Sequence, residues 1–222
     1  MESFKRLYRF LDASSAIKTI ERKMFRVGRI TEFNDPFEWR IGLSNYIENA
    51  EFIARSAQES MIHSMNSKFG VICFSDIASQ SILWSLYADH HRGIALAIDH
   101  NMDDKLHRMI YSNNRPTLNL SLFSKNDSDE HAKEVVTKML SHKSSGWSFE
   151  REYRVFADLA NCHVSDGHYF LPIPDNFLKK VILGFRCPVD EIYIKRCLQL
   201  ANLDEVEVVK AKDDMQSYNI IY

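Results

Sequence analysis

Glycine and proline are scarce in this sequence. Its 222 residues include 7 Gly and 5 Pro, which is below ordinary usage. Flexible and extended linkers are rich in these residues, so no long linker is expected. Hydrophobic residues make up 45% of the chain and aromatic residues 12%, enough for a sizeable core. We therefore predict one folded domain over residues 1–222.

Long apolar runs are also missing. No segment approaches the roughly 18 consecutive apolar residues of a membrane helix. The first residues, MESFKR, lack the apolar core of a signal peptide. The sequence therefore predicts no membrane span and no secretion, and we expect a cytoplasmic protein.

Metal-binding patterns are absent as well. The cysteines form no C-x-x-C pair, so we expect reduced thiols and no zinc site. The adjacent His90 and His91 would point in different directions on a helix, and no carboxylate at helical spacing completes a ligand set. No metal is expected. The four cysteines are Cys73, Cys162, Cys187 and Cys197.

No excess of positive charge is present. The 28 basic residues face 30 acidic residues, which gives a net charge of −2. Proteins that bind nucleic acid over a broad surface usually carry a clear positive excess. The composition thus argues against a strong nucleic-acid footprint, while a local basic patch stays compatible with it.

Apolar and alternating segments mark the expected elements. The helical pattern at residues 82–87 is apolar nearly all round, which predicts an internal helix. Strands and helices do not alternate regularly as in βαβ folds. We therefore predict an α+β domain with a mainly antiparallel sheet flanked by helices, and a split sheet is one form of it. Strands are expected at residues 7–10, 24–30, 69–75 and 93–99, and helices at 46–67, 101–109 and 189–201.

The densest polar and aromatic segment is WSFEREYRVF at residues 147–156. Its alternation from Arg151 onward predicts a strand that enters the core. On a strand, Glu150, Glu152 and Arg154 share one face, and the glutamates lie about 6–7 Å apart. Such a pair can present carboxylates to a sugar or another cationic transition state. An ion ladder between strands is the structural alternative.

The segment TEFNDPFEW at residues 31–39 carries turn signals. Asn34 and Asp35 can bond back to the backbone, and Pro36 restricts Asp35 to extended conformations. A structural turn explains Asn34 and Pro36. Asp35 and Glu38 remain candidate pocket residues, with Asn34 as a further one.

Six short motifs together resemble one family. In this combination the chain looks like a widespread prokaryotic domain-of-unknown-function family, family 2971, from about residue 7 to residue 184. Residues 185–222 are expected to complete the sheet with a helix and strands. The family is largely uncharacterised, so this resemblance implies little chemistry. The motifs are YRF at 8–10, FNDPFE at 33–38, CFS at 73–75, WxxYADxHxG at 84–93, WxxExEYR at 147–154 and ILG at 182–184.

A second, weaker resemblance is to the ADP-ribosyltransferase-like fold. One branch of that fold carries an arginine on the first strand, a serine on a middle strand and an E-x-E pair on a later strand. Arg9, Ser75 and the pair Glu150 and Glu152 occur here in that order. The resemblance implies that Arg9 contacts the phosphates or ribose of NAD and that Ser75 orients the nicotinamide side. Glu152 would hold the ribose hydroxyl while the glycosidic bond breaks.

The same resemblance implies further contacts in the pocket. Tyr87 or Trp84 would stack on nicotinamide. The sequence departs from the family pattern, because its serine is not in a Ser-Thr-Ser motif and a helix at residues 84–89 is additional to the simplest transferase core. The other expected pocket residues are Asp89, His91, Arg92 and Arg154.

Three functional hypotheses follow. The leading one is an NAD-using transferase or glycohydrolase of the kind found in bacterial toxin or phage-defence systems, with Glu152 and Glu150 as catalytic residues and an unidentified acceptor. The second is a non-catalytic binding or regulatory domain. The third is a nuclease that holds Mg²⁺ with carboxylates, although nearby arginines would compete with the metal. Its ligands would be Asp35, Glu38, Glu150 and Glu152.

Overall fold

The first elements of the chain form where local signals predict them. In the computed structural model, which describes residues 4–44, 50–101, 105–119 and 136–222, strand β1 (Phe4–Leu11) leads into helix α1 (Ala13–Arg22). Asp12 caps this helix, since its carboxylate accepts a hydrogen bond from the Ser15 backbone N–H at 2.9 Å. Strand β2 (Met24–Arg29) follows within the predicted range 24–30, and its alternation buries Phe25 and Val27.

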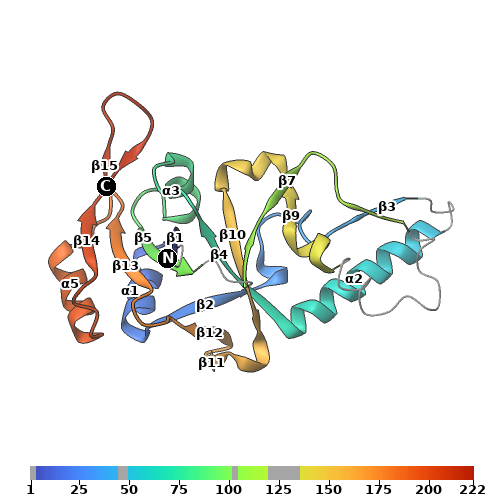
Figure 1. Cartoon of the computed structure of the whole chain (residues 1–222), viewed down its shortest axis with the longest axis horizontal. Coiled ribbons are helices and arrows are strands. Elements are labelled where there is room, and N and C mark those ends of the chain that lie inside the picture. The colour runs from blue at the N-terminus through green and yellow to red at the C-terminus, as the bar shows by residue number, and fades with distance from the viewer. Residues whose placement is uncertain (1–3, 45–49, 102–104, 120–135) are drawn as a thin grey trace.

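These strands belong to a ten-stranded sheet (Figure 1). Its main path runs β11-β12-β2-β4-β1-β5-β13-β14, and β10 pairs with β4 and β6. Strands β13 and β14 pair in parallel, and the other described pairs of this sheet are antiparallel. The predicted α+β class with a mainly antiparallel sheet is confirmed. The remaining strands are β4 (Phe69–Ser75), β5 (Ile94–Asn101), β6 (Leu106–Arg108), β10 (Glu152–Asp158), β11 (His163–Ser165), β12 (His168–Pro172), β13 (Leu178–Leu183) and β14 (Glu207–Lys210).

The sheet divides at β4. One edge of β4 pairs with β10 along its whole length, from Ser75 to Phe69. The other edge pairs with β1 only at the Tyr8–Ser75 position and with β2 only at Gly28–Val71 and Arg29–Gly70. Strands β1 and β2 therefore separate from each other beside the middle of β4, and α1 connects them.

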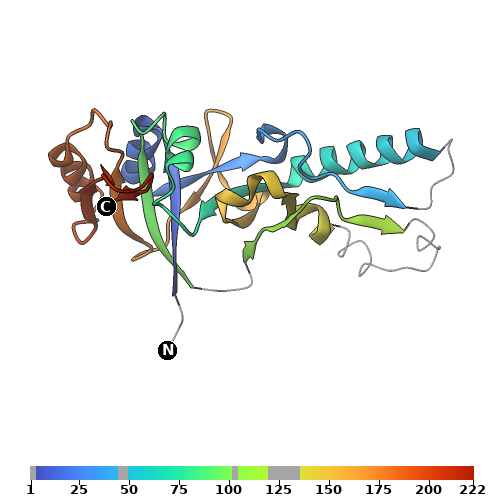
Figure 2. The same cartoon turned by 90° about the horizontal axis from the view of Figure 1, so that it is seen from above.

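Helices and small strand pairs surround this sheet. Helix α5 (Glu191–Leu200) lies beside β14, and the long helix α2 (Ala50–Lys68) extends away from the sheet together with β3 and β8 (Figures 1 and 2). No helix among the described residues has the length and apolar character needed to cross a membrane. The other elements are α3 (Ser81–Tyr87), the 3-10 helices η1 (Ile30–Glu32), η3 (Ser145–Glu150) and η4 (Leu159–Asn161), and the pairs β3 (Gly42–Ser44) with β8 (Thr117–Asn119), β7 (Ile110–Ser112) with β9 (His142–Ser144), and β15 (Lys212–Asp213) with β16 (Ile220–Ile221).

Three apolar clusters form the core. The largest joins α1 and α5 to the sheet and includes Leu7, Ile20 and Ile194. A second cluster packs α2 against β4, and a third packs the Trp84 side of α3 against β5 and β13. Burial of these side chains supplies the main driving force for folding.

Two predictions about elements are wrong. Helix α3 is not internal all round: Leu83 and Trp84 are buried, but Ile82 and Leu86 are 44% and 53% exposed, because the helix packs on the sheet through one side only. The helix expected at residues 101–109 is absent from the described part of that segment. Strand β5 reaches Asn101 and β6 occupies Leu106–Arg108, where pairing with β10 outweighs local helix propensity.

Candidate functional site

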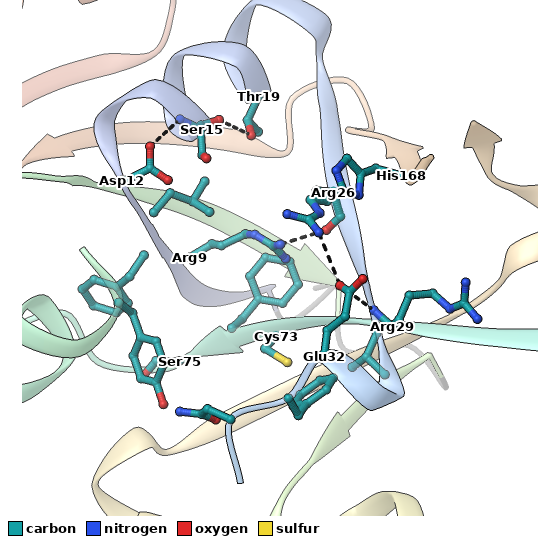
Figure 3. Close-up of a pocket in the computed structure, with 18 of the residues that line it drawn as sticks. Arg9, Asp12, Ser15, Thr19, Arg26, Arg29, Glu32, Cys73, Ser75 and His168 are labelled. Carbon is teal, nitrogen blue, oxygen red and sulfur yellow. Dashed lines mark hydrogen bonds and ion pairs between the residues drawn. The ribbon is translucent and has the colours of Figure 1, made fainter. Parts of the chain in front are cut away.

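A cavity of about 1050 Å³ lies where β1 and β2 separate beside β4 (Figure 3). Most of its wall residues come from β1, α1, β2, β4, α3 and β12, and from the end of η3. The size is at the upper end of the usual range for ligand pockets. The split in the sheet thus creates the main candidate site.

Six of the residues singled out in the sequence line this cavity. They come from segments that are far apart in the chain and meet only in the folded structure. They are Arg9, Asn34, Ser75, Tyr87, Glu150 and Glu152.

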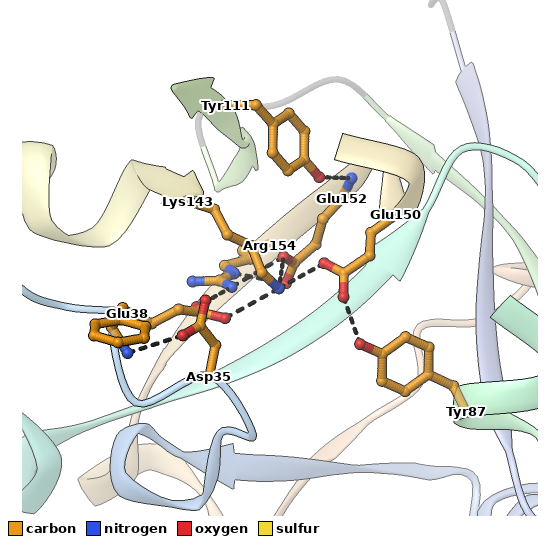
Figure 4. Close-up of polar contacts among 9 residues, drawn as sticks. Asp35, Glu38, Tyr87, Tyr111, Lys143, Glu150, Glu152 and Arg154 are labelled. Atoms are coloured by element: carbon orange, nitrogen blue, oxygen red, sulfur yellow. Dashed lines mark hydrogen bonds and ion pairs between the residues drawn. The ribbon is translucent and has the colours of Figure 1, made fainter. Parts of the chain in front are cut away.

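A buried cluster of charged side chains lies at one side of the cavity (Figure 4). The Lys143 Nζ lies 2.5 Å from a Glu150 carboxylate oxygen, 3.1 Å from Glu152 and 3.0 Å from Glu38. Arg154 Nε and Nη2 donate to the two oxygens of Glu152 at 2.7 and 2.9 Å. Three carboxylates and two cations therefore share one network, here called the ion cluster, which carries one net negative charge when all five groups are ionised.

Arg154 is the best-buried member of the ion cluster, with no exposed surface. Its Nη2 also donates to Glu38, and its guanidinium lies 4.8 Å from the ring centre of Trp39 and 5.0 Å from that of Phe33. Such aromatic faces stabilise a desolvated cation. Arg154 thereby holds the turn at residues 33–39 against β10, which makes it a structural residue and not a wall of the cavity.

The structure corrects the predicted position of Glu150. This residue ends η3, and Arg151 then adopts a left-handed conformation with φ of 48° before β10 begins at Glu152. Glu150 and Glu152 therefore do not share a strand face. The backbone reversal at Arg151 nevertheless brings both carboxylates to Lys143.

The two glutamates have opposite pKa shifts. Burial raises the pKa of Glu150, and the neighbouring charge of Glu152 adds to this, although Lys143 opposes both. Burial would also raise the pKa of Glu152, but Arg154 and Lys143 outweigh it and lower this pKa to about 2. Carboxyl pairs whose pKa values are pushed apart are typical of acid–base sites.

Two tyrosines contact the glutamates. The Tyr87 hydroxyl donates a hydrogen bond to Glu150, and the Glu152 backbone N–H donates to the Tyr111 hydroxyl at 2.8 Å. Burial raises the pKa of Tyr111 to about 12. Tyr87 lines the cavity, so its hydroxyl connects Glu150 to the space where a ligand would lie.

Ser75 is engaged by the backbone. Its hydroxyl donates to the Glu150 carbonyl at 2.6 Å and accepts from the Ile77 N–H at 3.3 Å. These contacts fix the end of η3 relative to β4. Ser75 is thus placed to orient Glu150, in addition to lining the cavity.

Arg9 lies on the other side of β4 from the ion cluster. Its Nη2 donates to the Arg26 carbonyl at 2.8 Å, across the gap between β1 and β2, and its guanidinium lies 5.6 Å from the ring centre of Phe25. Its Nη1 is buried without a hydrogen-bond partner. Burial lowers the Arg9 pKa to about 10, so this guanidinium stays charged at neutral pH.

Several predicted contacts lie elsewhere. Trp84 is fully buried and donates its indole N–H to the Ala78 carbonyl at 2.7 Å, so it cannot stack on a ligand in the cavity. The His91 ring packs against Phe185 and lines a separate, smaller cavity beside the β15–β16 hairpin. The other candidates outside the main cavity are Asp35, Glu38, Asp89, Arg92 and Arg154.

Sequence reasoning missed further residues of the site. Lys143 precedes the 147–156 segment and carries no local signal of its role, and Tyr111 lies on a short strand of another pair. Basic side chains of α1 and β2 also line the cavity. Their spacing on α1 was a usable signal, since residues four apart share a helix face. These side chains are Lys18, Arg22, Arg26 and Arg29.

The ion cluster bears on the nuclease hypothesis. The Lys143 ammonium occupies the position among Glu38, Glu150 and Glu152 where a magnesium ion would have to lie. Within the described ranges, no group of three or more His, Cys, Asp or Glu residues is arranged to hold a metal ion. The donor set does not fit a carboxylate-bound metal.

Comparisons with known proteins give one match, to a family model over the middle of the chain. No curated protein and no solved structure matches, so the ADP-ribosyltransferase-like resemblance stays a prediction. Residues 83–155, from α3 into β10, match the family described as "Protein of unknown function (DUF2971)", which confirms the first resemblance over this segment.

Proposed function

We propose that this protein cleaves the nicotinamide–ribose bond of an NAD-type dinucleotide, as a glycohydrolase or an ADP-ribosyltransferase. One observation carries the proposal. The cavity is lined on one side of β4 by Arg9, whose buried Nη1 has no hydrogen-bond partner, and on the other side by the glutamate pair.

This distribution of charge complements the dinucleotide. NAD carries a negative pyrophosphate in its middle and a positive nicotinamide ring at one end. Arg9 makes no ion pair with a carboxylate in the described ranges, and such a charged guanidinium favours binding of an anion, because the anion supplies the missing partner. The ion cluster, with one net negative charge, favours the positive end.

The reaction needs no group beyond water or an acceptor. The ribose C1′–N bond breaks, nicotinamide leaves with the bonding electron pair as a neutral molecule, and a water oxygen bonds to C1′. The water proton passes to a base, so that NAD⁺ and water become ADP-ribose, nicotinamide and a proton. A transferase would replace the water with an acceptor nucleophile.

The two glutamates suit different parts of this step. Glu152 has a pKa of about 2 and stays ionised, so its charge can stabilise the positive ribose in the transition state. Glu150, with its raised pKa and its hydrogen bond from Tyr87, suits transfer of the proton. An NAD-consuming enzyme of this kind would serve in bacterial toxin or phage-defence systems.

The test is nicotinamide release from NAD⁺ by the purified protein. The Glu150→Gln and Glu152→Gln variants should each lose release by at least about 100-fold, the usual contribution of a positioned acid or base. Glu207→Gln, in a partly exposed pair with Lys180 away from the cavity, is the matched control and should keep full activity.

The binding-domain hypothesis is distinguished in the same experiment. A folded wild-type protein that binds NAD⁺ without releasing nicotinamide would be a binding module. If it neither binds NAD⁺ nor releases nicotinamide, the proposed function is wrong. Circular dichroism of each variant separates loss of chemistry from loss of folding.

A further inference from the structure

A group of basic side chains extends the cavity beyond Arg9. Lys18 and Arg22 are four residues apart on α1 and therefore share one face of the helix. Arg26 on β2 and His168 on β12 line the same cavity (Figure 3). These four residues are called the rim cluster.

Phe170 lies among three members of the rim cluster. Phe170 pairs with Arg26 in the β12–β2 register, and His168 lies two residues before it, on the same face of β12. The Arg22 guanidinium lies 5.6 Å from the Phe170 ring centre. Arg9 Nη2 donates to the Arg26 carbonyl, so the rim cluster lies next to Arg9. Arg9 therefore lies between the glutamates and the rim cluster.

Acidic side chains neutralise only part of this charge. Glu32 accepts from Arg26 Nη2 at 3.3 Å, and Asp12 is occupied as the α1 cap. Asp166, which also lines this part of the cavity, accepts from the Ser165 hydroxyl at 3.2 Å. No ion pair to Lys18 or Arg22 is present in the described part of the chain, and both are exposed. Lys18 and Arg22 are therefore two cations that line the same cavity as Arg9 and have no ion-pair partner among the described residues.

The order of groups along the cavity indicates which part of a dinucleotide Lys18 and Arg22 would face. Glutamates come first, then Arg9, then the rim cluster. On the proposed function, on which this inference rests, the nicotinamide lies at the glutamates and the pyrophosphate at Arg9. The adenosine ribose then lies at the rim cluster.

We propose that the rim cluster binds a phosphate on the adenosine ribose, so that the protein takes the 2′-phosphorylated dinucleotide NADP⁺ in preference to NAD⁺. Arginine beside the ribose is a known way to accommodate a 2′-phosphate. Lysine and arginine supply the charge-assisted hydrogen bonds that a phosphate dianion accepts.

Binding of fragments without nicotinamide tests the subsite apart from catalysis. Adenosine 2′,5′-bisphosphate should bind the wild-type protein about tenfold more tightly than adenosine 5′-monophosphate, as expected for one additional charge-assisted contact. In the Lys18→Gln/Arg22→Gln double variant the ratio should fall close to one. The double variant Lys195→Gln/Arg196→Gln, on the exposed face of α5, should keep the tenfold ratio.

Each outcome bears on one claim. Equal binding of the two fragments by the wild-type protein, or a ratio unchanged in the Lys18/Arg22 variant, overturns the inference. A single-stranded oligonucleotide that binds more tightly than the bisphosphate through Lys18 and Arg22 also overturns it, because the phosphate would then belong to a nucleic acid.

Turnover separates this inference from the proposed function. If the bisphosphate is preferred but neither dinucleotide releases nicotinamide, the subsite stands and the proposed reaction is wrong. If NAD⁺ and NADP⁺ are cleaved with equal kcat/KM and the fragments bind equally, the reaction stands and the subsite is wrong. A higher kcat/KM for NADP⁺ that disappears in the Lys18/Arg22 variant supports both.

Discussion

Glu150 and Glu152 contact the same ammonium group, that of Lys143, yet their pKa values shift in opposite directions. The difference arises from Arg154, which holds Glu152 through two hydrogen bonds. Glu150 instead accepts from Tyr87 at the cavity wall. One carboxylate is thereby locked in its charged form, and the other is left able to exchange a proton.

Replacing Lys143 with methionine should destabilise the fold strongly. The change leaves three buried carboxylates with only Arg154 as a counter-ion, and breaking a buried pair typically costs about 3–5 kcal/mol. Urea denaturation measures the free energy of unfolding. Lys180→Met, in the partly exposed pair with Glu207, is the control and should cost about 0–1 kcal/mol. A loss below 1 kcal/mol for Lys143→Met would show that the ion cluster is not essential to the fold.

Replacing Glu152 with glutamine should have a pH-dependent cost. The pKa of Glu152 is lowered from 4.5 to about 2. Between these two pH values the Glu152 carboxylate stays charged in the folded state but becomes protonated in the unfolded state. This stabilisation, about 3 kcal/mol, is complete above pH 5 and is lost as the pH falls from about 5 towards 2. Unfolding of wild type and Glu152→Gln should therefore differ most at neutral pH and converge in acid. A difference that is constant across this range contradicts the assignment.

Replacing Tyr87 with phenylalanine should raise the pKa of Glu150 further. The Tyr87 hydrogen bond lowers that pKa, so its removal favours the protonated carboxyl and also costs about 1–2 kcal/mol of stability. A ¹³C NMR titration of glutamate side chains measures the shift directly. Tyr218→Phe, at a position 98% exposed, should leave the titration unchanged. An unaltered Glu150 titration in Tyr87→Phe would remove Tyr87 from the proposed proton path.

Alanine at Gly184 should destabilise the end of β13. A Cβ atom there would lie 2.2 Å from the His91 carbonyl oxygen, so the backbone of the α3–β5 connection would have to move, at a cost of at least about 2 kcal/mol. At Gly146 the nearest atom would be 3.8 Å away, and Gly146→Ala serves as the control. Thermal unfolding of both variants decides the point, and equal Tm values would contradict this account.

Much of the secondary structure could be predicted because its signals are local. Strand β4 spans the predicted residues 69–75, where a continuous apolar run ends at a polar turn. The start of α1 depends on a local signal of the same kind, since Asp12 caps the helix and aspartate is a preferred N-cap residue. Predictions failed where tertiary contacts decide: β6 forms because β10 supplies hydrogen bonds, and Glu150 leaves the strand because Arg151 adopts a positive φ without a glycine to signal it.

The sequence by itself determined the α+β class and the main elements, because hydrophobic periods, caps and turn chemistry act between near neighbours. The 147–156 segment indicated Glu150 and Glu152, and the resemblance to the ADP-ribosyltransferase-like fold added Arg9, Ser75 and Tyr87. Only the tertiary structure decided which charges meet. Lys143 and Glu38 reach the glutamates from separate segments, and Trp84 and His91 turn away from the cavity. The partner of a buried charge depends on contacts between distant parts of the chain, and these contacts form only in the folded structure, where the sheet divides at β4.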